Sequence, residues 1–169
     1  MSKSLDDKML AGIRLVAFDV DGVFTDGRFY LSNDGVESKA FSTQDGYGIR
    51  RLVDAGISVA VISGRKSAAV EQRMNELGVH FIVQGCGDKI AAFDVITSEL
   101  DITDDDCAYV GDDLPDLPLL SKVAVAIAVA NAVGELKQQC DYVTNARGGF
   151  GAVREVCDLL LGARPQDVK

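Results

Sequence analysis

This sequence lacks several features that would indicate secretion, a metal-binding cysteine site or membrane insertion. The four cysteines form no C-x-x-C pair; they are Cys86, Cys107, Cys140 and Cys157. This spacing favours buried free thiols in a reducing compartment over disulfides or a zinc site. Residues 1–12 carry charges but no apolar stretch typical of a signal peptide. The longest apolar run, residues 123–130, is too short to span a membrane, so we expect a cytoplasmic protein with no membrane partner.

Basic residues are also scarce. The chain has 17 Lys and Arg against 26 Asp and Glu, which gives a net charge of −9. A nucleic-acid surface needs a basic stripe, so we expect no nucleic-acid partner. A small anionic ligand stays possible if a metal ion and a few local cations reverse the field at its site. With 169 residues, 47% of them hydrophobic, and no repeat or linker, the sequence indicates one domain spanning residues 1–169.

Strand-like apolar runs alternate with helical patterns along the chain. Strands are expected over residues 13–19, 57–63, 80–84, 107–111, 123–128 and 141–144. Helices are expected over residues 46–55, 67–77, 89–100, 114–120, 132–140 and 153–161. Because the strands are almost continuously apolar, they predict a parallel sheet covered on both faces. The fold class is therefore α/β with an open, doubly wound, Rossmann-like sheet, whose site lies beyond the carboxyl ends of the strands.

Residues 27–41 interrupt this alternation. Two short strand-like runs flank Asp34-Gly35, and an Asp-Gly pair between such runs predicts a β-hairpin. Phe29, Leu31 and Val36 would give the hairpin apolar surface that it cannot bury alone. Packing onto its own domain is one outcome, but we favour pairing between subunits.

The most informative segment is residues 15–27, where an apolar run ends in Asp19-x-Asp21-Gly22. The two carboxylates would stand where the chain leaves the sheet. Neighbouring anions raise each other's energy unless a cation lies between them or one holds a proton. The pair therefore indicates a metal site, acid/base chemistry or both, although ordinary turn aspartates would give the same pattern.

Other strand ends carry polar residues that would meet at the same edge of the sheet. Ser63 ends the second strand, where it offers a hydroxyl and a backbone N–H to an anion, or simply caps a helix. Lys89 begins the helix after the third strand, and its ordinary role would be a solvated surface cation. Three acids, Asp112, Asp113 and Asp116, follow the fourth strand, which is more negative charge than helix capping requires.

The ordered set of D-x-D, serine, lysine and G-D-D-x-x-D resembles the haloacid dehalogenase superfamily of phosphotransferases over essentially the full length. Within it, the chain is most similar to the family of phosphatases that hydrolyse 3-deoxy-D-manno-octulosonate 8-phosphate (KDO 8-phosphate). The matching segments are residues 18–27, 39–41, 45–50, 63–66, 109–116 and 148–160.

The resemblance implies a role for each residue of the set. Asp19 would attack phosphorus and become an aspartyl phosphate, and Asp21 would protonate the leaving oxygen and then activate water. Asp19, the Asp21 carbonyl and Asp112 would hold Mg²⁺. Ser63 and Lys89 would bind the phosphoryl oxygens. Asp116 would support Lys89 or a metal-bound water, and Asp113 is a further supporting residue.

The resemblance also implies how a sugar acid phosphate in lipopolysaccharide sugar biosynthesis would be held. Its binding residues would be Asp21, Ser42, Thr43, Gln44, Asp45, Gly46, Arg50, Arg65, Arg73 and Lys89. The gaps between motifs hold no cap domain, so subunits of a homotetramer would close the open site, their 27–41 hairpins forming a central barrel. A neighbour's Lys39 or Tyr30 would reach the site.

Three alternatives compete with this interpretation. The first is a sibling phosphatase for a nine-carbon, sialic-type sugar acid phosphate, which tends to have Glu at the position of Arg65. The second is a non-catalytic phosphatase-like assembly module, although the acidic set here is intact. The third, a receiver domain, would need its phosphoacceptor Asp at the end of the third strand, where residues 83–85 are Val-Gln-Gly. The receiver interpretation fails on that ground.

Overall fold

The structure, a computed structural model, describes residues 5–165. Its main sheet has six parallel strands in the order β5-β4-β1-β6-β7-β8. The bounds are Leu15–Phe18 for β1, Ser58–Ile62 for β4, Phe81–Val83 for β5, Cys107–Gly111 for β6, Val125–Ala128 for β7 and Tyr142–Val143 for β8. The predicted parallel α/β sheet is therefore confirmed: β6 has the predicted bounds, and the other five predicted strands are present in shorter form.

The central strand β1 is the one that leads into the acidic motif. It pairs in parallel with β4 and β6, so Phe18 lies opposite both Val61 and Val110. All four residues of β1 are buried, as a central strand covered on both faces requires. The carboxyl ends of these three strands therefore lie side by side, and the residues that follow them are brought to one edge.

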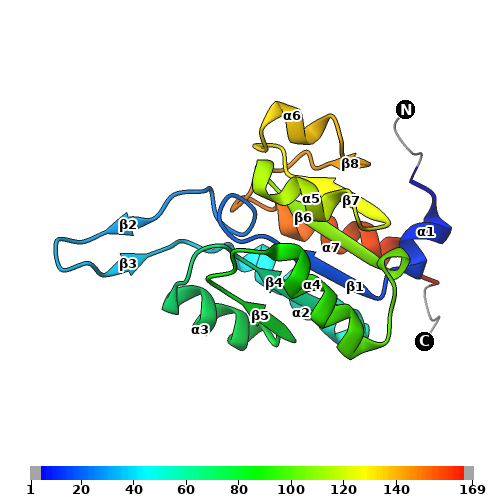
Figure 1. The fold of residues 1–169 in the computed structure, drawn as a ribbon, viewed down its shortest axis with the longest axis horizontal. Helices are drawn as coiled ribbons and strands as arrows, with labels where there is room; N and C mark the ends of the chain where they lie inside the picture. Colours follow the sequence, from blue (N-terminus) through cyan, green and yellow to red (C-terminus); the bar gives the residue numbers. More distant parts are fainter. Residues whose placement is uncertain (1–4, 166–169) are drawn as a thin grey trace.

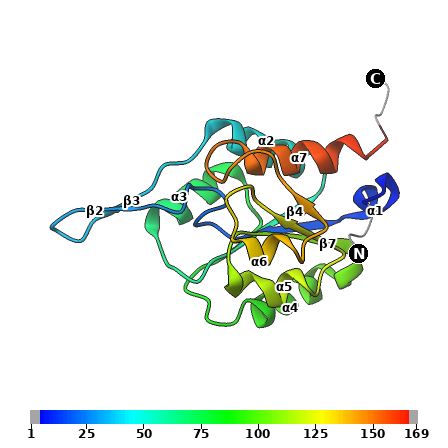
Figure 2. The same cartoon turned by 90° about the horizontal axis from the view of Figure 1, so that it is seen from above.

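Helices cover both faces of the sheet (Figure 2). In chain order they are α1 (Asp7–Gly12), α2 (Thr43–Asp54), α3 (Ala68–Leu77), α4 (Lys89–Leu100), α5 (Leu117–Leu120), α6 (Gly134–Lys137) and α7 (Ala152–Gly162). The pair α2 and α7 packs on one face, and α4 and α5 lie on the other. Two 3₁₀ turns, η1 (Asp104–Asp106) and η2 (Leu114–Asp116), complete the set. No helix of residues 5–165 is long and apolar enough to cross a membrane.

Some helix boundaries differ from the sequence-based expectation. The helix expected from residue 46 begins at Thr43, because the Ser42 hydroxyl accepts a hydrogen bond from the Asp45 N–H and caps the first turn. The helix expected over residues 132–140 is shortened to α6. The short helix α1 was not predicted; the Asp6 side chain caps it by accepting from the Met9 N–H at 2.6 Å.

The hairpin protrudes from the end of the domain opposite α1 (Figure 1). Its strands are only two residues each, β2 (Tyr30–Leu31) and β3 (Glu37–Ser38). The turn uses Gly35 at φ +78°, a conformation that favours glycine. Tyr30, Leu31 and Val36 are 71%, 65% and 63% exposed, so in the single chain the apolar surface of the hairpin is uncovered.

All four cysteines are free thiols, which agrees with the absence of disulfides expected from their spacing. Cys107 and Cys157 are buried. Cys86 and Cys140 are only half-buried, so the expectation of buried thiols holds for two of the four.

Candidate active site

Asp19 and Lys89 meet at the carboxyl edge of the sheet. Asp19 directly follows β1, and its N–H donates to the Val110 carbonyl at 2.9 Å, which continues the pairing with β6. The Asp19 side chain is 11% exposed. Lys89 is the first residue of α4, and its Nζ donates to Asp19 Oδ1 at 2.7 Å. A nearly buried carboxylate at the end of β1 thus faces a cation at the start of α4.

Asp116 organises the acidic segment that follows β6. Its Oδ1 accepts from Lys89 Nζ and from the Tyr109 hydroxyl, both at 2.7 Å. Its Oδ2 accepts from the N–H groups of Asp112 at 3.0 Å and Asp113 at 3.3 Å. Asp116 is therefore occupied by four donors, which agrees with the supporting role expected of it beside Lys89. The exposed Asp113 accepts from the Leu114 N–H at 2.8 Å and caps η2.

Three carboxylates form the one group of potential metal ligands found among residues 5–165. Asp19, Asp112 and Asp116 each place an oxygen within 4.8 Å of the others. Burial, and then the charge of Asp116, raises the pKa of Asp19 to about 6. Burial, and then the charges of Asp19 and Asp116, raises the pKa of Asp112 to about 7. Crowded, partly desolvated carboxylate oxygens of this kind suit a hard divalent cation, which would offset their repulsion.

Lys89 keeps its charge in this setting. Burial opposes the charge, but the carboxylates of Asp19 and Asp116 outweigh that effect and raise the pKa of Lys89 above its ordinary value. The ammonium group is therefore a permanent cation at the site, suited to an incoming anion.

Two residues for which no role was predicted, Thr25 and Asn131, hold the loop after β1. The Thr25 hydroxyl accepts from the N–H groups of Gly22 and Gly27, each at 3.2 Å. Asn131 donates to the Gly22 carbonyl at 2.9 Å and accepts from the Gly148 N–H at 2.6 Å. Gly22, at φ +89°, has no room for a side chain, since a Cβ there would lie 1.9 Å from Asp112 Oδ2. No local pattern identified Asn131, because its partners are distant in sequence.

Ser63 is buried at the end of β4, as expected, but its backbone is not available. The Ser63 N–H donates to the Val83 carbonyl at 2.9 Å within the sheet, so the expectation that it would bind an anion is wrong for this group. The hydroxyl accepts from the Arg65 N–H at 3.3 Å and keeps its own proton for another acceptor.

These residues surround a cavity of about 370 Å³. Its lining comes from four strand ends and comprises Asp19, Asp21, Gly27, Ser63, Gly64, Arg65, Lys89, Asp112, Asp113, Pro115 and Asp116. A volume of this size fits a small ligand. The cavity joins acidic groups able to hold a cation with two cations able to hold an anion.

Comparison with known proteins identifies the family. Residues 81–154 match the haloacid dehalogenase-like hydrolase family. The 3-deoxy-D-manno-octulosonate 8-phosphate phosphatase KdsC of Salmonella typhi is 50% identical over 90% of this chain and 81% of its own length. The chain belongs to the KdsC phosphatase family. It is therefore an enzyme, a phosphatase of the haloacid dehalogenase superfamily.

Solved structures of this family agree with the fold. The Yersinia pestis enzyme matches with a TM-score of 0.92 and 46% identity, over 94% of this chain and 85% of its own. The Moraxella catarrhalis enzyme, solved in complex with magnesium, phosphate and KDO, matches with a TM-score of 0.91 and 44% identity, over 94% and 91%. The predicted haloacid dehalogenase fold without a cap domain is confirmed.

The second set of expected substrate residues does not line the cavity. Ser42 caps α2, and Thr43 and Gln44 are exposed on its first turn. The buried Asp45 accepts from the Arg154 N–H at 2.9 Å and so caps α7. Burial raises the pKa of the Asp45 carboxyl, against the hydrogen bonds that it accepts.

Two of the expected arginines converge instead on Glu76, near the end of α3. Arg50 Nη1 donates to the Glu76 carbonyl at 3.0 Å, and Arg73 Nη1 lies 3.4 Å from Glu76 Oε2. Gly46 makes room for this arrangement, since a Cβ there would lie 2.4 Å from Arg73 Nη2. In the single chain, Arg50, Arg73 and Glu76 therefore form a separate polar group that is not part of the cavity wall.

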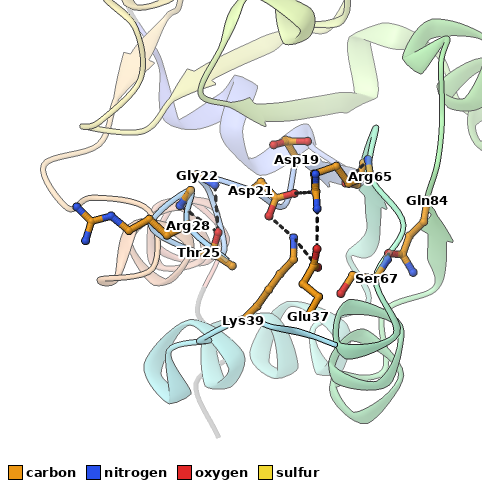
Figure 3. Close-up of polar contacts among 12 residues, drawn as sticks. Asp19, Asp21, Gly22, Thr25, Arg28, Glu37, Lys39, Arg65, Ser67 and Gln84 are labelled. Carbon is orange, nitrogen blue, oxygen red and sulfur yellow. Dashed lines mark hydrogen bonds and ion pairs between the residues drawn. The ribbon is translucent and has the colours of Figure 1, made fainter. Parts of the chain in front are cut away.

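Arg65 and Asp21 belong to a ring of alternating charges at the cavity mouth (Figure 3). Arg65 Nη2 donates to Glu37 Oε2 at 2.6 Å, and Arg65 Nε lies 3.9 Å from Asp21 Oδ2. Lys39 donates to Asp21 Oδ1 and lies 3.6 Å from Glu37 Oε1. The Phe29 ring stacks on the Arg65 guanidinium with 4.1 Å to the ring centre. Lys39 thus reaches the site of its own chain, whereas the sequence suggested a neighbour's.

Proposed function

We propose that this phosphatase hydrolyses KDO 8-phosphate to KDO and phosphate, in lipopolysaccharide sugar biosynthesis. The observation that carries the proposal is the 50% identity, over 90% of the chain, to enzymes that bear this activity in their name. The cavity offers a nucleophile, a group for proton transfer, and cations for the phosphoryl oxygens. The intact acidic set argues against a non-catalytic assembly module.

Asp19 acts as the nucleophile in the proposed reaction. Its carboxylate oxygen attacks phosphorus while the bond from phosphorus to the sugar oxygen breaks. Asp21 gives its proton to that leaving oxygen and then takes a proton from the water that attacks the aspartyl phosphate. Phosphate leaves and the Asp19 carboxylate is restored. Lys89, fixed at 2.7 Å from Asp19 Oδ1, offsets negative charge that builds up on the phosphoryl oxygens, and the Ser63 hydroxyl donates to them.

Mg²⁺ is the proposed cofactor. Asp19, the Asp21 carbonyl and Asp112 would hold it. The proposal is supported by the raised pKa of Asp19 and of Asp112, because burial and neighbouring carboxylates disfavour their charged forms and a bound cation would offset both effects. When bound, Mg²⁺ supplies positive charge that orients the phosphoryl group and neutralises it. Asp116 is left out of the proposed ligand set, because Lys89, Tyr109 and two backbone N–H groups already occupy it.

Arg65 is the proposed reader of the substrate's carboxylate. A guanidinium fork binds a carboxylate through two parallel hydrogen bonds. The Arg65 side chain is 49% exposed at the cavity mouth, and stacking on Phe29 fixes its plane. Arg50, Arg73 and the segment 42–46 do not line the cavity of the single chain. They are proposed to contact the rest of the sugar acid only where a neighbouring subunit of the proposed tetramer closes the open site.

The functional unit is proposed to be a cytoplasmic homotetramer assembled through the 27–41 hairpin. The support is the hairpin's uncovered apolar surface, at Tyr30, Leu31 and Val36, and its unpaired backbone edges. Four hairpins closed into a barrel would remove both features at once, and closed symmetry would make the assembly finite.

A phosphate-release screen tests the proposed substrate. The wild-type enzyme with Mg²⁺ is offered KDO 8-phosphate, a nine-carbon sugar acid 9-phosphate and simple sugar phosphates. We expect the highest kcat/KM for KDO 8-phosphate. A clear preference for the nine-carbon substrate would instead assign the chain to the sibling activity, and no release from any ester would refute the proposal.

A further inference from the structure

The buried lysine at the base of the hairpin is the feature that the proposed reaction leaves unexplained. The side chain of Lys39 is 0% exposed, and among residues 5–165 its Nζ has one hydrogen-bond acceptor, Asp21 Oδ1. Lysine is rarely buried unless it is paired, because desolvation of its charge is costly. The fold thus places a buried cation directly on the carboxylate assigned to proton transfer.

The hairpin delivers Lys39 by the alternation of an extended chain. Glu37 lies in β3 and Lys39 follows it two positions later, so both side chains point to the same face, toward Asp21 and Arg65 (Figure 3). Ser38, between them, is exposed on the other face. The centre of the Phe29 ring, in the opposite arm of the hairpin, lies 6.0 Å from Lys39 Nζ and 4.1 Å from the Arg65 guanidinium.

Glu37 balances the charge of this lysine. Its Oε1 lies 3.6 Å from Lys39 Nζ and has no hydrogen bond of its own, while its Oε2 pairs with Arg65 at 2.6 Å. Burial opposes the charge of Glu37, but Arg65 and Lys39 hold its pKa below its ordinary value. When Asp21 is ionised, as it is after it has given up its proton, two carboxylates and two cations alternate and the ring carries no net charge.

We propose that Lys39 is a positioning residue for Asp21, supplied by the chain's own hairpin. It acts by fixing one oxygen of the Asp21 carboxylate, so that the other faces the cavity where the leaving oxygen lies. Proton transfer requires the acid to lie within hydrogen-bond reach of the leaving oxygen, and a freely rotating carboxylate meets that condition less often. This inference rests on the proposed function, which assigns proton transfer to Asp21.

The test compares two leaving groups. A sugar alkoxide needs a proton as it departs, whereas the nitrophenolate of p-nitrophenyl phosphate leaves without one. The quantity measured is kcat/KM, which reports the steps up to departure of the leaving group. For Lys39→Met we expect kcat/KM for KDO 8-phosphate to fall by about 10- to 100-fold, part of the full contribution of a general acid. For p-nitrophenyl phosphate we expect a change below about threefold, because general-acid assistance is not needed there.

Three further variants act as controls. Lys39→Arg keeps the cation and should lose less kcat/KM for KDO 8-phosphate than Lys39→Met does. Lys8→Met removes an exposed lysine of α1, at the other end of the domain, and should change neither substrate. Lys39→Gln, which is polar and neutral, replaces Lys39→Met if circular dichroism shows that the latter does not fold.

The outcomes separate this inference from the proposed function. Equal losses of kcat/KM on both substrates would show that Lys39 only stabilises the hairpin or contributes positive charge to the site in general. That result would overturn the inference. Unchanged rates on both substrates would overturn it as well. A wild-type enzyme that releases phosphate from no ester would refute the proposed function itself, and the inference with it.

Discussion

Replacing Asp112 by Asn should make the metal-free protein more stable at neutral and higher pH. Asp112 Oδ2 lies in a crowded position against Gly22, and the charges of Asp19 and Asp116 are close by. Because its pKa is about 7 in the folded chain, against an ordinary value of 3.8, the folded state holds the proton more tightly than the unfolded state does. As the pH rises from the lower of these pKa values to the higher, the free energy of unfolding therefore falls.

The magnitude follows from the same two pKa values. At 1.36 kcal/mol per pKa unit, the move from 3.8 to about 7 corresponds to about 4 kcal/mol at most. Asp19 shares the site and titrates with Asp112, and solvent reaches part of the side chain, so we expect about 2 kcal/mol. The gain from Asp112→Asn should be complete near pH 8 and should vanish below about pH 3, where the wild-type carboxyl is protonated in both the folded and the unfolded state.

Urea unfolding in chelator, followed by circular dichroism at several pH values, measures this difference. Asp113→Asn is the matched control, since Asp113 is the exposed neighbour, and it should show no comparable pH-dependent gain. Added Mg²⁺ should stabilise the wild type more than Asp112→Asn, because the variant lacks an anionic ligand. A metal-free Asp112→Asn protein that is less stable than wild type near pH 8 would refute the reasoning.

Two further predictions concern the substrate and the assembly. Arg65→Ala should raise KM for KDO 8-phosphate by about 10- to 150-fold, the equivalent of a lost charge-assisted hydrogen bond of about 1.5–3 kcal/mol, with a much smaller change for a carboxylate-free sugar phosphate. Equal increases in steady-state KM for both substrates would place Arg65 on the phosphate instead. Leu31→Asp with Val36→Asp should convert a tetramer to monomers in light scattering while circular dichroism stays native, since both side chains are exposed and far from the core. A monomeric, fully active wild type would contradict the assembly.

Much of the fold could be predicted because its signals are local. Apolar runs marked every strand of the main sheet, and the acidic motifs stood at strand ends, which parallel pairing brings together. The start of α2 was missed because the glycines at 46 and 48 hid a helix whose capping residue, Ser42, lies earlier. The hairpin strands are shorter than the sequence pattern suggests, because only two residues of each strand are paired with the other strand.

The site was predicted where motifs carry it and missed where long-range contacts decide it. Asp19, Lys89 and Asp116 meet as expected, because each begins or follows a regular element. The role of Asn131 was not predicted, because its partners Gly22 and Gly148 are distant in sequence. The contact of Lys39 with Asp21 of the same chain depends on the orientation of the hairpin relative to the domain. Sequence periodicity does not predict that orientation.

The central claim is that Asp19 attacks phosphorus, and one measurement tests it most directly. Phosphate release from KDO 8-phosphate is followed with saturating Mg²⁺ for the wild type and for Asp19→Asn, after mass spectrometry has excluded deamidation of the variant. The account predicts steady release by the wild type and a loss of about 10³-fold or more in the variant, since an amide cannot form the aspartyl phosphate. An Asp19→Asn enzyme that works at nearly the wild-type rate would contradict it.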